Sequence, residues 1–257
     1  MREFLEEALD HRDDGYGRAQ KADQRQLPKR FYSEAGYARD GDAFVVTLDG
    51  RPTRTPGQVP VRVPVEPVAA RLAEEWGAQG TEIDPETMPH VRLVNSAVEG
   101  GEGVRPGLID EVVSYAGNDL LLYRADSPRE LVALQEEKWD AVLVALARHL
   151  SVGFSPTVGI LHRPQAEETL ARLRGVIAED GLFRAAALAS ITSLTGSGLL
   201  AIALREELVA RDAAWTAAHV DEDYQASLWG EDFEAAKRRT RRRAEYDAAV
   251  NLLEWTA

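Results

Sequence analysis

Hydrophobic and polar positions along the chain follow two different periods, and the change between them divides the sequence. Between residues 36 and 64, apolar residues alternate with polar ones in runs rich in β-branched and aromatic side chains. This alternation is typical of strands that bury one face. We expect strands near residues 36–39, 43–48, 51–55 and 60–64, which together form a twisted antiparallel meander.

The turns of this meander contain Asp-Gly at residues 40–41 and again at residues 49–50. Asp-Gly is a strong hairpin signal, because a type I′ turn requires positive φ at both of its central residues. Each dipeptide therefore predicts a tight hairpin.

The period becomes helical at residues 65–79. Val68, Leu72 and Trp76 are four residues apart, which places them on one helical face, and Pro67 falls in the first turn. After about residue 104 the strand signals fade and amphipathic helical segments follow. These segments are residues 107–124, 127–150, 165–180, 182–194, 198–229 and 231–255.

The predicted fold class is α+β, with a small N-terminal domain of twisted antiparallel sheet and helix followed by a larger all-helical C-terminal domain. We expect three parts: a polar N-terminal arm at residues 1–28, an α+β domain at residues 29–105 and a helical domain at residues 106–257. A short helix is expected within the arm, at residues 2–9.

The apolar stretch at residues 182–204 is long enough to cross a bilayer. Arg184 interrupts it, serine and threonine dilute it, and Gly196 and Gly198 break its middle. These interruptions favour two buried helices that meet at a Gly-Ser-Gly joint, and they argue against membrane insertion.

Composition narrows the classes of partner. The chain has 257 residues and a formal net charge of −13, which disfavours nucleic acids and anionic membranes as partners. The absence of cysteine excludes disulfides, thiolate metal sites and cysteine nucleophiles, and it is typical of a reducing compartment. No secretory signal or transit peptide is recognisable, so we expect a cytoplasmic protein.

The segment DEDYQASLWGEDFE, residues 221–234, concentrates candidate chemistry. It admits three interpretations: a metal or acid–base site, a structural helix start, or an acidic surface that binds another protein. A metal site is disfavoured because adjacent acids on a helix point in different directions, and the spacing differs from that of a calcium loop. An enzymatic alternative remains, a carboxylate-dependent metal hydrolase that uses Asp221, Glu222, Asp223, Glu231 and Glu234.

The structural interpretation predicts that Trp215 and Trp229 anchor one packed helical face. Gly230 then ends the helix, and Glu231, Asp232 and Glu234 occupy the first turn of the next one, where the helix dipole favours carboxylates. Glu234 is spaced to pair with Arg238.

The basic run KRRTRRR at residues 237–243 surrounds a helix on every side and has no interleaved aromatic residues. This pattern favours a solvated or acid-paired helix surface over a nucleic-acid site. His11, His90, His149, His162 and His219 are scattered without metal-ligand spacing, and no nucleophile elbow or phosphate-binding loop is present.

Several passages together resemble the assembly chaperone that acts on the α subunit of the F-type ATP synthase catalytic head, a family of mitochondria and alphaproteobacteria. The resemblance lies in KRFY at 29–32, VTLDGRPTRTP at 46–56, LAEEWGAQGTEIDPETMP at 72–89, YAGNDLLLYRA at 115–125, LQEEKWDAVL at 134–143 and DEDYQASLWGEDFE at 221–234.

The resemblance implies a non-enzymatic chaperone without a cofactor, which holds the free α subunit until the β subunit arrives. It implies two domains and a monomer when free. It also implies that a functionally important acid lies in the Trp-Gly-Glu-x-x-Glu region, at Glu231 or Glu234. The partner-binding residues expected on this basis are Glu222, Asp223, Trp229, Glu231, Asp232 and Glu234.

Overall fold

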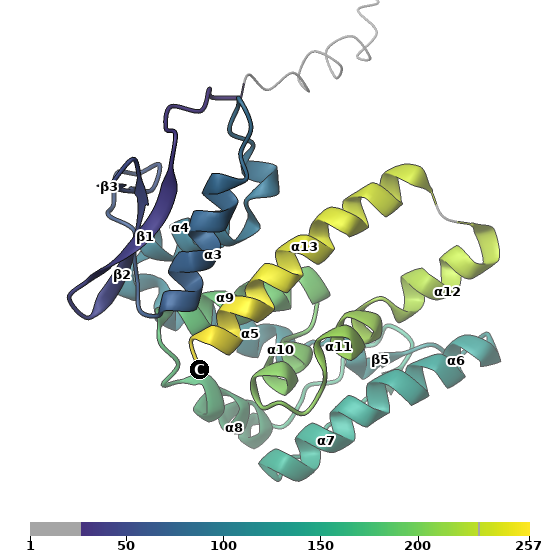
Figure 1. Ribbon diagram of the computed structural model, residues 1–257. Helices are drawn as coiled ribbons and strands as arrows, with labels where there is room; N and C mark the ends of the chain where they lie inside the picture. Colours follow the sequence, from purple (N-terminus) through teal and green to yellow (C-terminus); the bar gives the residue numbers. More distant parts are fainter. Residues whose placement is uncertain (1–26, 231) are drawn as a thin grey trace, which may run out of the picture. The chain divides into compact units, whose positions relative to one another are not determined.

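The computed structural model describes residues 27–230 and 232–257 (Figure 1). Most of the predicted polar arm, including its short helix at residues 2–9, lies outside the described residues. The chain divides into two compact units, residues 1–31 with 79–84 and residues 32–78 with 85–257. In the described part of the first unit, Lys29 forms an antiparallel bridge with Glu82.

The second unit contains all the strands that the structure describes. They are β1 Ala35–Asp40, β2 Ala43–Leu48, β3 Arg51–Pro52, β4 Arg62–Val63, β5 Tyr123–Arg124 and β6 Thr157–Val158. The first four form an antiparallel sheet in which β2 is central and pairs with β1, β3 and β4, whereas β5 and β6 form a short parallel pair. The predicted antiparallel sheet is therefore confirmed, but the four strands do not form a simple meander, because β4 pairs with β2 and not with β3.

The two Asp-Gly turns differ from each other. Asp49 and Gly50 both have positive φ, 47° and 75°, as a type I′ turn requires. In the first turn, Asp40 instead pairs with Ala43, so the central residues are Gly41 and Asp42. Gly41 alone of the two has positive φ, 67°, and the predicted type I′ geometry at residues 40–41 is wrong. The pairing of β1 with β2 places this turn one residue later.

The strands β3 and β4 are shorter than the predicted 51–55 and 60–64. Pro52, Pro56 and Pro60 have no amide hydrogen to donate to a neighbouring strand, so pairing between them is reduced to an isolated bridge of Arg54 with Pro60.

The described helices account for most of the remaining chain. They are α3 Glu66–Gly77, α4 Pro89–Gly100, α5 Arg105–Gly117, α6 Arg129–Gln135, α7 Ala141–Leu150, α8 Glu167–Ile177, α9 Leu182–Thr195, α10 Gly198–Arg205, α11 Arg211–Ala218, α12 Val220–Trp229 and α13 Phe233–Trp255. Short 3-10 turns occur at Pro85–Thr87, Glu102–Val104 and Leu120–Leu122, and a π-helical turn at Glu136–Asp140.

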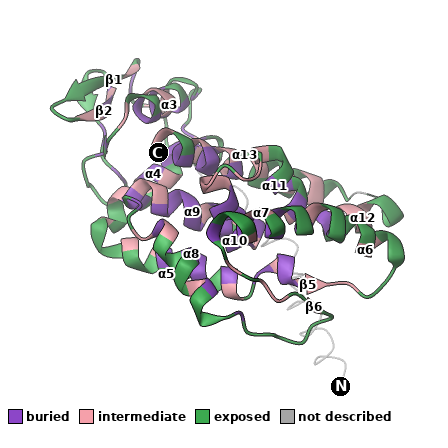
Figure 2. Ribbon diagram, turned by 90° about the horizontal axis from the view of Figure 1, so that it is seen from below, coloured by how far each residue is buried: buried purple, intermediate pink, exposed green. Residues whose placement is uncertain are grey.

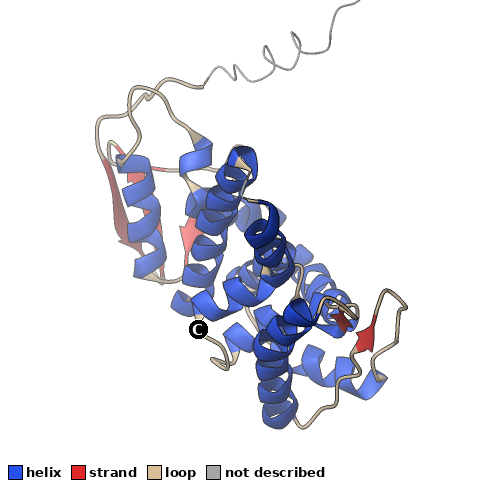
Figure 3. Ribbon diagram, turned by 90° about the vertical axis from the view of Figure 1, so that its right-hand side faces the viewer, coloured by secondary structure: helices blue, strands red, loops and turns tan. Residues whose placement is uncertain are grey.

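Helix α3 packs against the sheet, as its sequence period predicted. Val68 and Leu72 are buried on that face, and Pro67 lies in the first turn. Figure 3 shows α3 beside the strands. The α+β fold class, with a small sheet region and a mostly helical remainder, is confirmed.

Helix α9 forms the centre of the helical region and packs against α4, α5, α10 and α13. Buried residues run along α9 and α10 (Figure 2). Gly196, with φ of 70°, ends α9, and the Ser197 hydroxyl caps α10 by accepting from the Leu200 amide at 2.9 Å. The predicted joint between two buried helices is confirmed. No helix in the described part of the chain has the length and hydrophobicity needed to cross a bilayer.

Asp119 binds the start of α10 from inside the core. Its carboxylate is fully buried and accepts hydrogen bonds from the Ser197 hydroxyl at 2.7 Å, the Leu199 amide at 2.9 Å and the Leu121 amide at 3.2 Å. Burial raises the pKa of Asp119 from 3.8 to about 7, and these hydrogen bonds oppose the rise.

Asp119 should therefore contribute to the pH dependence of stability. Because its folded pKa is raised, its contribution to the unfolding free energy is fully present below about pH 4 and is lost as the pH rises through about 7. We expect the difference in unfolding free energy between wild type and Asp119→Asn to grow as the pH falls from about 8 to about 5. Urea denaturation of both proteins at several pH values measures this difference. A difference that does not change with pH contradicts the raised pKa of Asp119.

Two predicted long helices are divided in the structure. The segment 127–150 becomes α6, the π-helical turn and α7, and the segment 198–229 becomes α10, α11 and α12. The domain boundary near residue 105 stays a prediction.

Candidate functional site

The acidic segment forms all of α12 except its first residue, the connecting turn and the start of α13. Gly230 ends α12 with φ of 85°, a conformation that favours glycine. Asp232 then caps α13, because its carboxylate accepts a hydrogen bond from the Ala235 amide at 3.0 Å. The predicted break at Gly230 is confirmed. The next helix begins at Phe233, so of the acids predicted in its first turn Glu234 lies there and Asp232 is the cap. Glu231, between them, lies outside the described residues.

Three large apolar side chains at this turn are exposed to solvent. Trp229 is 79% exposed, Phe233 77% and Leu228 56%. We call these three residues the apolar tip. Single exposed apolar residues are ordinary on protein surfaces, but a cluster that includes a tryptophan and a phenylalanine is typical of a binding surface.

The predicted packing of Trp229 with Trp215 is wrong. Trp215 is buried, and its ring lies 5.0 Å from that of Tyr246. The segment expected to be one helix breaks at His219, where α11 ends and α12 begins. The two tryptophans therefore lie on different helices, and Trp229 at the end of α12 is left exposed.

The acids of the segment have different surroundings. Asp221 accepts a hydrogen bond from Gln135 Nε2 at 2.7 Å, which ties α12 to α6, and Asp223 forms an ion pair with Arg239 of α13. The Glu222 carboxylate is exposed and lies 4.0 Å from His219 Nε2. Asp221 and Asp223 thus hold α12 in place.

Asp232 and Glu234 are exposed beside the apolar tip. The predicted ion pair of Glu234 with Arg238 does not form between these two described residues. Glu222, Asp232 and Glu234 therefore remain available to solvent, although Asp232 also serves as the cap.

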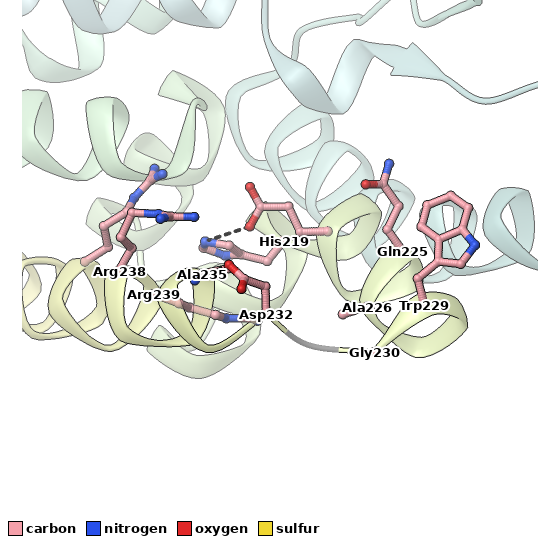
Figure 4. Close-up of a pocket in the computed structure, with 11 residues that line it drawn as sticks. His219, Gln225, Ala226, Trp229, Gly230, Asp232, Ala235, Arg238 and Arg239 are labelled. Atoms are coloured by element: carbon pink, nitrogen blue, oxygen red, sulfur yellow. Dashed lines mark hydrogen bonds and ion pairs between the residues drawn. The ribbon is translucent and has the colours of Figure 1, made fainter. Parts of the chain in front are cut away.

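A cleft of about 360 Å³ lies between α12 and α13. In Figure 4, Gln225 and Trp229 lie at one end, Arg238 and Arg239 at the other, and His219 and Asp232 between them. His219 is buried, and its Nδ1 donates to the Trp215 carbonyl at 2.8 Å. Burial lowers the pKa of His219, so its imidazole is neutral at pH 7.

The basic run at residues 237–243 is partly acid-paired and partly solvated, as the sequence indicated. Arg239, Arg241 and Arg243 form ion pairs with carboxylates, and Arg242 donates to a backbone carbonyl at 2.6 Å. The carboxylate partners are Asp223, Glu86, Asp212 and Asp247.

The geometry offers little to the hydrolase alternative. Among residues 27–230 and 232–257, no group of three or more histidine and acidic side chains is arranged to hold a metal ion. Asp221 and Asp223 are bonded to protein side chains, and Asp232 caps a helix. The described acids therefore do not converge on a common point.

Sequence reasoning missed the exposure of Leu228 and Phe233 and the arginine-lined wall of the cleft. The pair Trp229-Gly230 did contain a sequence signal for apolar exposure at this turn. A glycine that ends a helix leaves the preceding aromatic residue at the helix terminus. The cleft depends on the distance between two helices, which no local pattern encodes.

Comparison with known proteins gives consistent matches. The family model of the ATP12 chaperone protein matches residues 29–147. A candidate chaperone from Agrobacterium tumefaciens has a solved structure that is 39% identical, with a TM-score of 0.86, over 98% of this chain and 95% of that one. Atp12 from Paracoccus denitrificans is 34% identical, with a TM-score of 0.82, over 90% of this chain and 99% of that one. An aspartate-to-lysine mutant of Atp12p from P. denitrificans is 34% identical, with a TM-score of 0.80, over 90% of this chain and 98% of that one.

Proposed function

This chain belongs to the ATP12 chaperone family, and from that membership we propose that it binds the free α subunit of the F-type ATP synthase catalytic head and holds it until the β subunit arrives. The resemblance of the motifs at residues 29–234 suggests the α subunit as the client. The observation that carries the proposal is the exposed apolar tip, with the exposed acids Asp232 and Glu234 in the same turn.

An unassembled subunit exposes an apolar interface that aggregates, so a holding chaperone must cover that interface reversibly. The apolar tip supplies side chains for this contact. An aromatic residue at the centre of an interface commonly contributes much of the binding energy, which makes Trp229 the anchor of the proposed contact.

The exposed acids supply specificity. Asp232 and Glu234 are exposed at the same turn as the apolar tip, Glu222 is exposed in the first turn of α12, and Glu231 belongs to the turn in the sequence. Carboxylates in this position attract a client surface rich in Arg or Lys, and such attraction raises the association rate more than the affinity. Asp223 contributes indirectly, because its ion pair with Arg239 fixes the angle between α12 and α13.

The proposed role is non-enzymatic and needs no nucleotide or other cofactor. Release follows when the β subunit competes for the interface that the chaperone covers. A cytoplasmic location stays a prediction.

Trp229→Ala should weaken retention of the α subunit by about tenfold or more, because the anchor of the contact is removed. The unfolding free energy should change little, since the side chain is 79% exposed. Both quantities are accessible from purified variants, by pull-down of the α subunit from cell lysate and by thermal denaturation.

Two charge-reversal variants separate an effect on binding from an effect on folding. Glu234→Lys in the first turn of α13 should reduce the association rate, whereas Glu168→Lys in the first turn of α8 should not. Both variants lose a similar interaction with a helix dipole, about 0.3–1 kcal/mol, so their stabilities should match. Equal retention by wild type and Trp229→Ala, together with equal association rates of wild type and Glu234→Lys, would count against the proposed surface.

A further inference from the structure

The cleft between α12 and α13 opens beside the apolar tip and has walls of unlike character. The α12 side and the connecting turn supply Glu222, Gln225, Ala226, Trp229, Gly230 and Asp232, and the α13 side supplies Ala235, Arg238, Arg239 and Arg242. Figure 4 shows Arg238 and Arg239 at the end opposite Trp229. Its volume of about 360 Å³ has room for one or two amino-acid side chains.

Two arginines of the α13 wall lack a carboxylate partner in the described chain. Arg239 forms its ion pair with Asp223, but Arg242 donates only to the Leu194 carbonyl, and Arg238 forms no ion pair with a described residue. Arg238 and Arg242 are four residues apart, a spacing at which like charges on one helical face repel each other. The chain has 43 acidic and 30 basic residues, so carboxylates are in excess, yet no carboxylate among residues 27–230 and 232–257 forms an ion pair with either arginine.

The charges of the cleft select the kind of anion. Arg239 is neutralised by its ion pair with Asp223, so among the described residues Arg238 and Arg242 contribute two unpaired positive charges, and Glu222 and Asp232 contribute two negative charges. His219 is neutral at pH 7 and adds nothing. Because these described charges balance, the cleft has no excess positive charge to compensate a phosphate dianion, and a singly charged carboxylate is the better match. Two guanidinium groups on one face also suit a carboxylate, which accepts hydrogen bonds on both oxygens.

We propose that this cleft binds a glutamate or aspartate side chain of the client polypeptide between Arg238 and Arg242, while a neighbouring apolar side chain of the client covers Trp229. This inference rests on the proposed function, because it assigns the occupant of the cleft to the client. The client segment that binds here then carries both signs of charge. A basic residue of the client pairs with Glu234, and an acidic residue pairs with Arg238 and Arg242. A mixed requirement of this kind discriminates against purely basic and purely acidic surfaces.

Two short peptides test the cleft without the α subunit. The probes are N-acetylated, C-amidated Leu-Glu-Leu-Lys and the matched Leu-Gln-Leu-Lys, and the readout is the NMR signals of the arginine Nε–H groups. We expect the glutamate peptide to shift the signals of Arg238 and Arg242 and to bind about fivefold tighter than the glutamine peptide. Inorganic phosphate should not displace it. Equal binding of the two peptides, or displacement by phosphate at similar concentration, overturns the proposal.

Matched variants locate the effect. Arg238→Gln combined with Arg242→Gln should abolish the preference for glutamate, whereas Lys237→Gln, adjacent but outside the cleft, should keep it. The single variant Arg238→Gln loses no hydrogen bond to the described chain, so it still tests the proposal if the double variant unfolds. A preference that survives in Arg238→Gln overturns the proposal.

Retention of the α subunit from cell lysate separates this inference from the proposed function. Lower retention by both Trp229→Ala and Arg238→Gln, with Lys237→Gln unchanged, supports both. Lower retention by Trp229→Ala alone overturns the cleft proposal and leaves the proposed function standing. If wild type retains no α subunit, the proposed function fails, and with it the assignment of the occupant to this client.

Discussion

The Glu75→Ala variant should lose about 3–5 kcal/mol of unfolding free energy, because it removes one partner from a buried, hydrogen-bonded network. Glu75 is buried on α3, and its carboxylate caps the start of α4. It accepts hydrogen bonds from the amides of His90 at 3.1 Å and Val91 at 2.9 Å, and it lies 2.7 Å from His90 Nδ1.

The imidazole of His90 extends this network to the C-terminal helix. Asn251 Nδ2 lies 3.1 Å from His90 Nε2, and the Trp255 ring stacks on the imidazole. With a proton on Nδ1, the His90 imidazole donates to Glu75 and accepts from Asn251 at Nε2. Loss of the carboxylate leaves buried donors without partners, and that loss is the physical reason for the large expected effect.

Urea denaturation of Glu75→Ala measures this effect, and Glu74→Ala provides the control. Glu74 is the next residue on the same helix, its side chain is 66% exposed, and it pairs only with Arg71. Its removal should cost less than about 1 kcal/mol. A similar loss in the two variants would show that the network adds nothing to stability.

The Gly198→Ala variant should lose about 3 kcal/mol or more, because α10 crosses α5 at a distance that admits no side chain. A Cβ atom at this position would lie 2.2 Å from the Val112 carbonyl oxygen and 2.8 Å from the Ala116 amide nitrogen, both of them backbone atoms of α5. The backbone cannot rotate away as a side chain does, so α10 must move. Such a movement also disturbs the hydrogen bonds that Asp119 makes to the start of α10.

Gly175→Ala serves as the control for this clash. Gly175 lies in α8, and a Cβ atom there meets nothing within 4 Å. Alanine in a helix is favoured over glycine by about 0.5–1 kcal/mol, so this variant should gain stability. The two alanine variants should shift the thermal midpoint in opposite directions, and a neutral Gly198→Ala would contradict the close approach of the two helices.

The elements of the fold were predictable where one strong period governed many residues. The helical spacing of Val68 and Leu72 correctly predicted the buried face of α3, and Gly196 with Ser197 correctly predicted the joint in the apolar stretch. The α+β class followed from the order of these periods along the chain. Local patterns succeeded here because local and tertiary preferences agree.

The errors arose where tertiary packing decided between acceptable local structures. Nothing in the helical period of residues 198–229 signals a break at His219, and that break turns Trp229 from a predicted core residue into an exposed one. The pairing of Asp40 with Ala43 likewise places a turn one residue from its sequence signal. The candidate site was found in the right segment, but its exposed and bonded acids could be told apart only from contacts with Gln135 and Arg239.

The uninterrupted length of α13 limits how the chain can change by insertion or deletion. Its 23 residues correspond to about 34 Å of rigid rod. One end of the rod is bonded to His90 through Asn251, and the other carries Phe233. One residue added between these points would rotate Phe233 by about 100° around the axis and advance it by about 1.5 Å. Length changes that preserve the orientation of the tip must therefore come in whole turns, as additions or losses of about seven residues.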